Sequence, residues 1–179
     1  DLDQFSYSEF KQLALYCHRV ASAVALLSVE IFGYKNRTTL KYAQNIGMAL
    51  QLTNIIRDIR EDAERGRIYL PLDEVSRFNV KTDDLLSLKS SPELVELLKY
   101  QSHRAKQYFH QAMTVLPDDD RYNQRASLIM ANIYQATLSE IEQDDFQVMQ
   151  YRVSLTPLRK FWIAWTTARA QKRWKDPAT

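Results

Sequence analysis

Glycine and cysteine are scarce in this chain of 179 residues, and its net charge is small. Three glycines are too few for a sheet-rich fold, which would need many tight turns. A single cysteine, Cys17, excludes an intrachain disulfide framework. No apolar segment near the amino terminus is typical of a signal peptide or a membrane span, so the cytoplasm is the default compartment.

The overall composition is that of one well-buried domain. Hydrophobic residues make up 45% of the chain and charged residues 26%, with no compositional sign of disorder. The formal net charge is +2, although Lys and Arg cluster near the carboxy terminus. These basic residues are not interleaved with a recognition module, so the pattern does not favour nucleic-acid binding.

Caps, glycines and prolines divide the chain into helices. Ser6 and Glu9 have capping-box spacing, and Gly33 and Gly66 can end the first two helices. The residue before Pro71 is biased away from helix, so RIYLP is predicted to be extended. The expected helices cover residues 7–32, 39–64, 72–78, 83–88, 92–115, 120–142 and 157–174. Because no strand pattern, repeat or linker interrupts this series, we predict a single all-α domain over residues 1–179.

A stripe of small and polar residues runs along the second of these helices. At about 100° per residue, its members fall within an arc of roughly 80°. They are Gly47, Gln51, Asn54, Asp58 and Asp62. A solvated face would carry long Lys and Glu side chains, whereas this one holds a glycine, two amides and two short acids. The stripe therefore predicts the wall of a cavity.

The two acids of the stripe are one helical turn apart and repel each other unless a cation lies between them. Magnesium prefers oxygen ligands and is usually held by one or two carboxylates together with substrate phosphates. Gln51 and Asn54 could bond to metal-bound waters or phosphate oxygens. Arg57, Arg65 and Arg67 offer positive charge to a diphosphate. The alternative is a surface helix laced with salt bridges, in which Arg65 pairs with Asp62 or Glu61.

Three segments carry a resemblance to a known family. QLTNIIRDIRED (51–62), followed by GRIYLP (66–71), closely resembles the second aspartate-rich signature of squalene and phytoene synthases. YCHRVASAVA (16–25) resembles another signature of that family. The segment 129–165 is similar to the carboxy-terminal part of bacterial presqualene diphosphate synthases of hopanoid pathways. Together these segments imply an isoprenoid synthase helical bundle.

The resemblance also implies a reaction. Two farnesyl diphosphates would condense head to head, through a cyclopropyl intermediate, to presqualene diphosphate, with Mg²⁺ holding the diphosphates and no nicotinamide required. Carried over, Asp58 and Asp62 bind magnesium, Gln51 and Asn54 support the metal and diphosphate, Arg57 and Arg152 contact diphosphate, and Tyr16 and Tyr134 line the reacting centre. The alternatives are a dehydrosqualene or phytoene synthase, or a non-catalytic helical scaffold. Oligomeric state and prenyl chain length stay open.

Two departures from the family pattern bear on these expectations. Family members usually have glycines where this chain has Ser22 and Ala25. The larger side chains would leave less space on the helix surface beside the prenyl tunnel. The family also carries a first aspartate-rich motif well upstream of the tyrosine signature, where this chain has no room for it. Residues 118–120 are better interpreted as a helix start. We therefore expect an incomplete bundle, about the carboxy-terminal two thirds of a longer enzyme, with little or no activity by itself.

The last expected helix is amphipathic and rich in aromatic residues. One face carries Leu158, Phe161, Trp162, Trp165 and Ala168, and basic residues lie on or near the polar side. Such a helix could lie on an anionic membrane. The alternative is a helix that packs its apolar face on the core and exposes a basic face.

Overall fold

The computed structural model describes residues 6–175, and this part of the chain is built from helices, as the sequence predicts. Within these residues the β-type pairing of the backbone is limited to an isolated parallel bridge between Ser6 and Ile68. The first half contains α1 (Phe10–Cys17), the π-helical η1 (His18–Ser22), α2 (Ala23–Phe32), α3 (Thr38–Arg57), α4 (Ile59–Glu64), α5 (Leu72–Arg77) and α6 (Thr82–Leu86). The second half contains α7 (Pro92–Val115), α8 (Asp118–Arg121), α9 (Arg125–Gln143), η2 (Gln147–Met149), α10 (Pro157–Gln171) and η3 (Lys172–Trp174).

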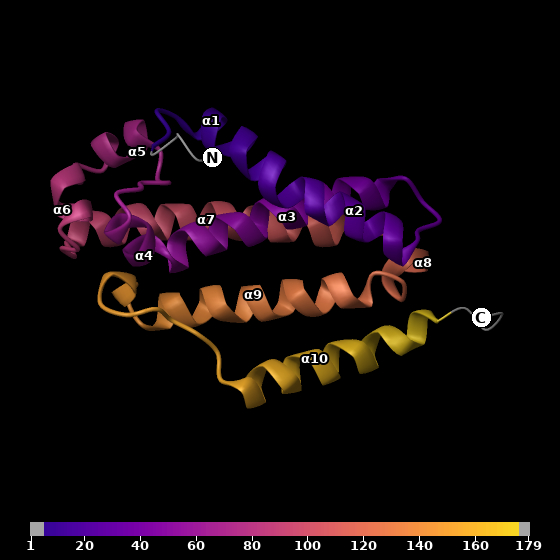
Figure 1. Cartoon of the computed structure of the whole chain (residues 1–179). Coiled ribbons are helices and arrows are strands. Elements are labelled where there is room, and N and C mark those ends of the chain that lie inside the picture. Colours follow the sequence, from indigo (N-terminus) through magenta and orange to yellow (C-terminus); the bar gives the residue numbers. More distant parts are fainter. Residues whose placement is uncertain (1–5, 176–179) are drawn as a thin grey trace.

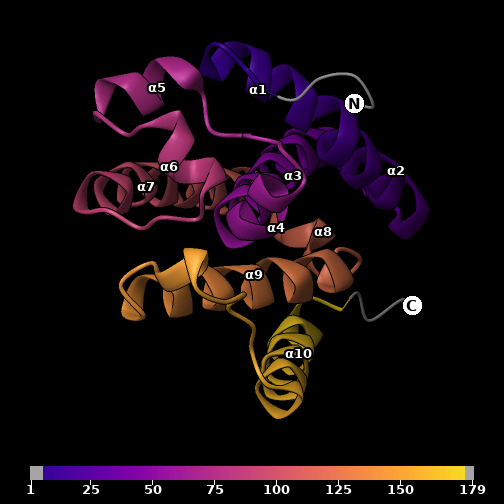
Figure 2. The same cartoon turned by 60° about the vertical axis from the view of Figure 1, so that its left-hand side comes forward.

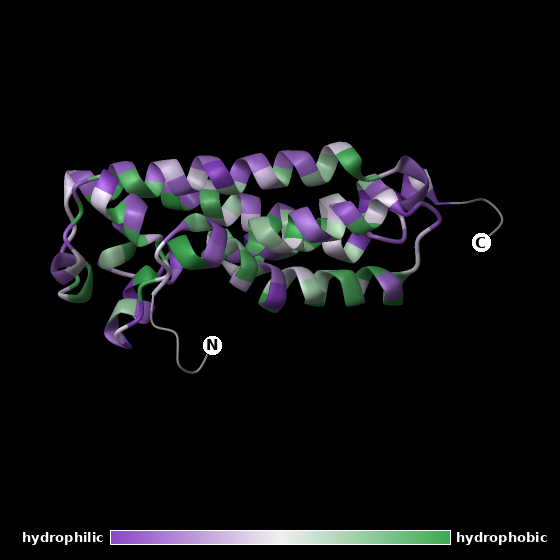
Figure 3. Ribbon diagram, turned by 90° about the horizontal axis from the view of Figure 1, so that it is seen from above, coloured by the Kyte–Doolittle hydropathy of each residue, from purple (hydrophilic) through white to green (hydrophobic). Residues whose placement is uncertain are grey.

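Helix α3 is the centre of the arrangement. It packs against α7 on one side, η1 and α2 on another, and α9 on a third (Figures 1 and 2). Hydrophobic and hydrophilic residues alternate along the long helices, as amphipathic elements require (Figure 3). The largest fully buried side chains include Tyr42, Ile46, Leu52 and Ile56 from α3, Leu94, Leu97 and Leu98 from α7, and Leu138 and Ile141 from α9. Helix α10 contacts this core through α9 (Figure 2).

The first long helix starts later than predicted. It begins at Phe10 with Glu9 as a cap that makes no side-chain bond, so the expected capping box at Ser6 is wrong. The reason is tertiary: Ser6 bridges to Ile68, and the carbonyl oxygens of the next two residues accept hydrogen bonds from the backbone at the start of α5. These bonds require extended backbone. At its other end the helix stops at Gly33, where φ is +78°, as expected.

The helical stretch from α1 to α2 is long, apolar and largely exposed. Residues Phe10–Phe32 form 23 continuous helical residues, and an 18-residue window of them has a mean hydropathy of 1.4, enough by length and composition alone to cross a membrane. Only 17% of that apolar window is buried. Leu27 is 65% exposed and Ile31 is 82% exposed. Core helices of soluble proteins pass the same test of length and composition, so the expected absence of a membrane span near the amino terminus stays a prediction.

The second predicted helix is interrupted at Asp58. Helix α3 ends at Arg57 and α4 begins at Ile59, because Asp58 has φ −100° and ψ 12°. Backbone hydrogen bonds still cross the break, from Asp58 N to Asn54 O at 2.8 Å and from Asp62 N to Asp58 O at 3.0 Å. The one-turn relation between the two acids therefore survives.

The predicted helix over 120–142 is two helices, α8 and α9. Asp120 is fully buried, and its carboxylate accepts hydrogen bonds from Lys35 N at 2.6 Å, Asn36 N at 3.1 Å and Thr39 Oγ1 at 2.6 Å. It thus fixes the turn that leads into α3. The interpretation of residues 118–120 as a helix start is confirmed.

Candidate functional site

All eight predicted site residues line one cavity of about 520 Å³. They come from α1, α3, the break between α3 and α4, α4, α9 and the loop before α10, and they are Tyr16, Gln51, Asn54, Arg57, Asp58, Asp62, Tyr134 and Arg152. Ile55, Glu61, Arg65 and Tyr69 complete the lining. We call this set the polar cavity. Arg67, also considered as a diphosphate ligand, does not line it.

Two arginines hold Asp58. Arg57 donates from Nε to Asp58 Oδ1 and from Nη2 to Asp58 Oδ2, both at 2.7 Å. Arg152 Nε donates to Asp58 Oδ1 at 2.9 Å. Arg152 Nε also lies 3.5 Å from Glu61 Oε2. Burial acts to raise the pKa of Asp58, but the two arginines outweigh it and the pKa falls below its usual value. Among the described residues, Arg65 forms no ion pair with Asp62 or Glu61, although the salt-bridge alternative expected one. The pairs that form here are Arg57 with Asp58, and Arg152 with Asp58 and Glu61.

Asp62 is in the opposite situation. Its pKa is raised from 3.8 to about 6 by burial, and next by the negative charge of Asp58. Arg65 and Arg67 lower it only in part. Within residues 6–175 no side chain donates a hydrogen bond to this carboxylate. A cation between Asp58 and Asp62 would relieve this penalty.

The two amides of the stripe leave one oxygen free. Asn54 Nδ2 lies 3.5 Å from Gln51 Oε1, a long contact. Asn54 Oδ1 is buried with no hydrogen-bond partner. An unsatisfied buried oxygen costs about 1–3 kcal/mol. Such an oxygen suits a donor brought in with a ligand, for example a water bound to a metal ion.

These residues fit a magnesium ion that takes further ligands from its substrate. Two carboxylates one turn apart and a free amide oxygen are hard oxygen donors of the kind that Mg²⁺ prefers. The part of the chain that the structure describes holds no group of three or more His, Cys, Asp or Glu side chains that could bind a metal together. The fit is therefore to a partial coordination sphere completed by phosphate oxygens and water.

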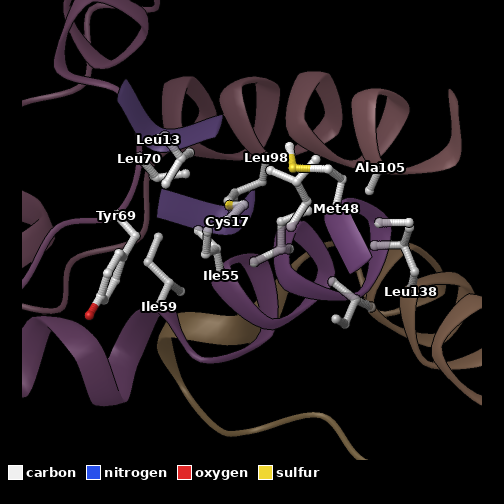
Figure 4. Packing of buried hydrophobic residues seen from close by; sticks show 14 of the residues in the cluster. Leu13, Cys17, Met48, Ile55, Ile59, Tyr69, Leu70, Leu98, Ala105 and Leu138 are labelled. Carbon is white, nitrogen blue, oxygen red and sulfur yellow. The ribbon is translucent and has the colours of Figure 1, made fainter. Parts of the chain in front are cut away.

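Three tyrosine rings lie together beside the polar cavity, and two of them, Tyr16 and Tyr69, line it. The Tyr16 ring lies 5.3 Å from Tyr7 and 5.4 Å from Tyr69, centroid to centroid. Burial raises the pKa of Tyr16, and a hydrogen bond with Tyr69 raises it further, so Tyr16 stays protonated at neutral pH. Figure 4 shows the Tyr69 hydroxyl pointing away from the packed core residues. Opposite, the Arg57 guanidinium lies 5.9 Å from the Tyr134 ring centroid.

Sequence reasoning missed Tyr7 and Tyr69 as neighbours of the site. The signal was present, since RIYLP was expected to be extended and to follow the aspartate pair. What was absent was its partner: Ser6 pairs with Ile68, and this pairing brings Tyr7 and Tyr69 within 6.0 Å of each other.

An apolar groove of about 330 Å³ adjoins the polar cavity. Its lining residues are Val20, Ala21, Val24, Ala25, Ser28, Phe32, Ile46, Gly47, Leu50, Gln51, Asn54, Ala126, Ser127, Met130 and Tyr134. Three residues line both spaces: Gln51, Asn54 and Tyr134. We call this second space the apolar groove. The stripe on α3 and α4 therefore runs from an apolar end at Gly47 to an acidic end at Asp62.

The two residues that depart from the family pattern lie in different surroundings. Ala25 lines the apolar groove, as expected. Ser22 does not line it, since its side chain is buried and Oγ donates to Gln44 O at 3.1 Å. Ser22 faces the backbone of α3, where a Cβ on Gly47 would lie 2.6 Å from Ser22 Cα. Only Ala25 can narrow the groove.

Known proteins resemble this chain along most of its length. A phytoene synthase from Mycobacterium tuberculosis is 35% identical over 167 residues, covering 92% of this chain and 55% of that protein. A phytoene synthase from Solanum lycopersicum is 36% identical over 169 residues, covering 89% and 40%. The chain thus spans about half the length of the curated relatives it matches.

Solved structures show the same helical fold. A dehydrosqualene synthase in complex with ligand superposes with a TM-score of 0.79 at 25% identity, over 96% of this chain and 60% of that one. The squalene synthase HpnC from Alicyclobacillus acidocaldarius gives 0.73 at 23% identity, over 82% and 56%. The sequence model of the squalene/phytoene synthase family matches residues 1–159. The chain belongs to the squalene/phytoene synthase family of prenyltransferases.

Proposed function

We propose that this chain forms part of a magnesium-dependent prenyltransferase that joins two prenyl diphosphates head to head. The observation that carries the proposal is the contact between the polar cavity and the apolar groove at Gln51, Asn54 and Tyr134. A prenyl diphosphate has the same division, an anionic head and an apolar tail. The boundary between the two spaces is where its reacting carbon would lie.

The lining residues suit the ionisation of an allylic diphosphate. Departure of diphosphate creates a carbocation and an anion, so positive charge is needed at one end and an aromatic or apolar wall at the other. Arg57, Arg65 and Arg152 supply charge in the polar cavity. The rings of Tyr16 and Tyr134 supply an aromatic wall, and the protonated Tyr16 hydroxyl can donate to the leaving oxygen. Bound magnesium would add charge neutralisation of the diphosphate.

The ion pairs of Asp58 couple these roles. Arg57 and Arg152 both donate to its carboxylate. Guanidinium groups bind phosphate in the same forked geometry as carboxylate. When the Asp58 carboxylate binds a metal cation instead, both arginines become available to the diphosphate that accompanies the metal. Substrate and metal are therefore expected to bind together more tightly than either does separately.

The identity of the substrate has two candidates. The similarity of residues 129–165 to presqualene diphosphate synthases favours farnesyl diphosphate and a step that needs no nicotinamide. The names of the curated relatives, phytoene synthases at 34–36% identity, favour the phytoene synthase alternative, for which the longer geranylgeranyl diphosphate serves as the probe. The dehydrosqualene synthase alternative is compatible with the same fold and the same site. The reaction class is common to all of these.

A non-catalytic scaffold is the rival from another class. A structural helix has no need for an unpaired acid at Asp62 beside the ion-paired Asp58, a free amide oxygen and three arginines around one cavity. Asp62 costs stability in its present setting, since its pKa is raised. A scaffold would lose such a residue readily.

The deciding experiment is product analysis of the intact protein with Mg²⁺ and either farnesyl or geranylgeranyl diphosphate, with and without reduced nicotinamide. We expect a head-to-head product from one of the two substrates, and its disappearance when Asp58 and Asp62 are both changed to Ala. The substrate that reacts identifies the candidate. No product from either substrate would favour the scaffold.

A further inference from the structure

Helix α10 has one face that packs and one that does not. The packing face meets α9, where Thr167 is 6% exposed and accepts a hydrogen bond from Asn132 Nδ2 at 2.8 Å. The opposite face carries Leu158, Phe161, Trp162 and Trp165, with exposed fractions of 82%, 70%, 62% and 46%. We call these four residues the outer face of α10. The alternative in which the aromatic residues pack on the core is therefore wrong.

The outer face is a compact aromatic surface. Trp162 and Trp165 lie 5.2 Å apart between ring centroids, and the four residues are spaced at i, i+3, i+4 and i+7. Soluble proteins seldom leave such a set open to water without a partner. Tryptophan prefers the boundary between a bilayer and water because its ring is amphipathic.

The charge around the outer face has one sign. Between residues 155 and 175 the chain has no Asp or Glu, and its charged residues are Arg159, Lys160, Arg169, Lys172, Arg173 and Lys175. The whole chain has 24 basic and 22 acidic residues, so the basic excess resides in this segment. Arg159 pairs with Glu140 on α9. Arg169 lies over the Trp165 ring at 5.6 Å and, with Lys172, continues the outer face by further turns.

We infer that the outer face of α10 docks on an anionic lipid bilayer, with its aromatic residues at the level of the headgroups and Arg169 and Lys172 on lipid phosphates. The charge decides between occupants. A second protein segment would need acidic residues to match the cations, and the cores of protein interfaces are depleted in charge. An anionic bilayer satisfies aromatic and basic residues together.

The exposed apolar face of α2 offers an internal comparison. Leu27 and Ile31 are as exposed as the outer face, but α2 has no Lys or Arg and its charged residue is Glu30. Hydrophobic exposure alone therefore does not distinguish the two surfaces. A membrane that selects by charge should discriminate between them. The proposed lipid substrate gives an additional reason for membrane contact, and only that reason rests on the proposed function.

The test is co-sedimentation of the intact protein with vesicles of phosphatidylcholine alone, or of equal parts phosphatidylcholine and phosphatidylglycerol. Tryptophan fluorescence provides a second readout. We expect binding to the anionic vesicles with a blue shift, and binding at least about tenfold weaker in the Phe161→Ser, Trp162→Ser variant. Arg169→Gln with Lys172→Gln should weaken it about tenfold or more, since each cation is worth about 1 kcal/mol. High salt should reduce this second effect.

Two matched controls keep the result specific. Leu27→Ser with Ile31→Ser removes two exposed apolar side chains from α2, and Lys41→Gln with Lys81→Gln removes two exposed lysines elsewhere; neither should change vesicle binding. Circular dichroism checks that each variant folds. Equal binding to both vesicle types, or none, would overturn the inference. So would a self-association that the Phe161→Ser, Trp162→Ser variant abolishes while vesicles stay unbound. Neither result depends on catalytic activity.

Discussion

The polar cavity and the apolar groove are built on the same helix but are stabilised in different ways. In the polar cavity, charged side chains from distant parts of the sequence hold one another, as Arg152 holds Asp58 across 94 residues. In the apolar groove, small residues let two helices approach until the backbone at Ser22 touches Gly47. One region depends on charge balance, the other on volume. Substitutions in the polar cavity should therefore act through charge, and substitutions in the apolar groove should act through volume.

The largest effect is expected from the acidic end. Changing Asp58 and Asp62 together to Ala should lower product formation by the intact protein about a thousandfold or more, because charge stabilisation of the leaving diphosphate is lost. The matched control changes Asp118 and Asp119, two acids remote from the cavity, and should retain activity. Steady-state kinetics with Mg²⁺ measures both. Equal rates in the two double variants would refute a metal role for α3 and α4.

The next effect is on the close contact between helices. Gly47→Ala places a Cβ 2.6 Å from Ser22 Cα, a clash with backbone that no rotamer relieves, so we expect a loss of about 2–3 kcal/mol in the free energy of unfolding. Gly66→Ala meets no atom within 4 Å, and its cost, about 1–2 kcal/mol, comes from φ +73°. Urea unfolding ranks the two. A Gly66 variant that is the less stable would contradict the packing seen at Gly47.

A smaller effect should separate volume from charge. Ala25→Phe fills the apolar groove and should shift the ratio of kcat/KM values toward the shorter prenyl diphosphate by about tenfold. Met130→Ala widens the same groove and should shift the ratio the other way. Neither should alter Mg²⁺ dependence, because both lie away from the acids. Identical ratios in both variants would show that the groove does not hold the prenyl chain.

The smallest effect is a pH dependence of stability. The pKa of Asp62 rises from 3.8 to about 6 on folding, so the folded protein binds more protons between these values and loses stability as the pH rises through them. Asp62→Asn should therefore stabilise the metal-free protein at pH 7, by about 1 kcal/mol after solvent screening.

Asp58 is expected to show the reverse sign. Its pKa is lowered on folding, so its contribution is present above its ordinary pKa and is lost as the pH falls. Asp58→Asn should destabilise the protein at pH 7. Thermal unfolding at pH 7 and pH 5 without metal measures both variants. A destabilising Asp62→Asn would show that this carboxylate is satisfied in the fold.

Much of the fold could be predicted because its signals are local. The helix over 92–115 has its expected bounds, since Pro92 follows a cap at Ser91 that accepts from Leu94 N at 3.2 Å. The start of the first helix could not be predicted, because Ser6 gives up its capping role to pair with Ile68, 62 positions along the chain. Local propensity is overruled wherever a distant segment offers the backbone better hydrogen bonds.

The candidate site divides in the same way. The spacing of Gln51, Asn54, Asp58 and Asp62 placed them on one wall because helical geometry repeats every 3.6 residues. Arg152 and Tyr134 came only through the family resemblance, and Tyr69 was not anticipated. The sequence by itself determined the all-α fold, the family and the composition of the acidic wall, since these depend on periodicity and motifs within single helices. Tertiary structure decided which acid is neutralised, where the groove opens and which face of α10 meets solvent, because charge pairing and burial depend on residues far apart in the chain.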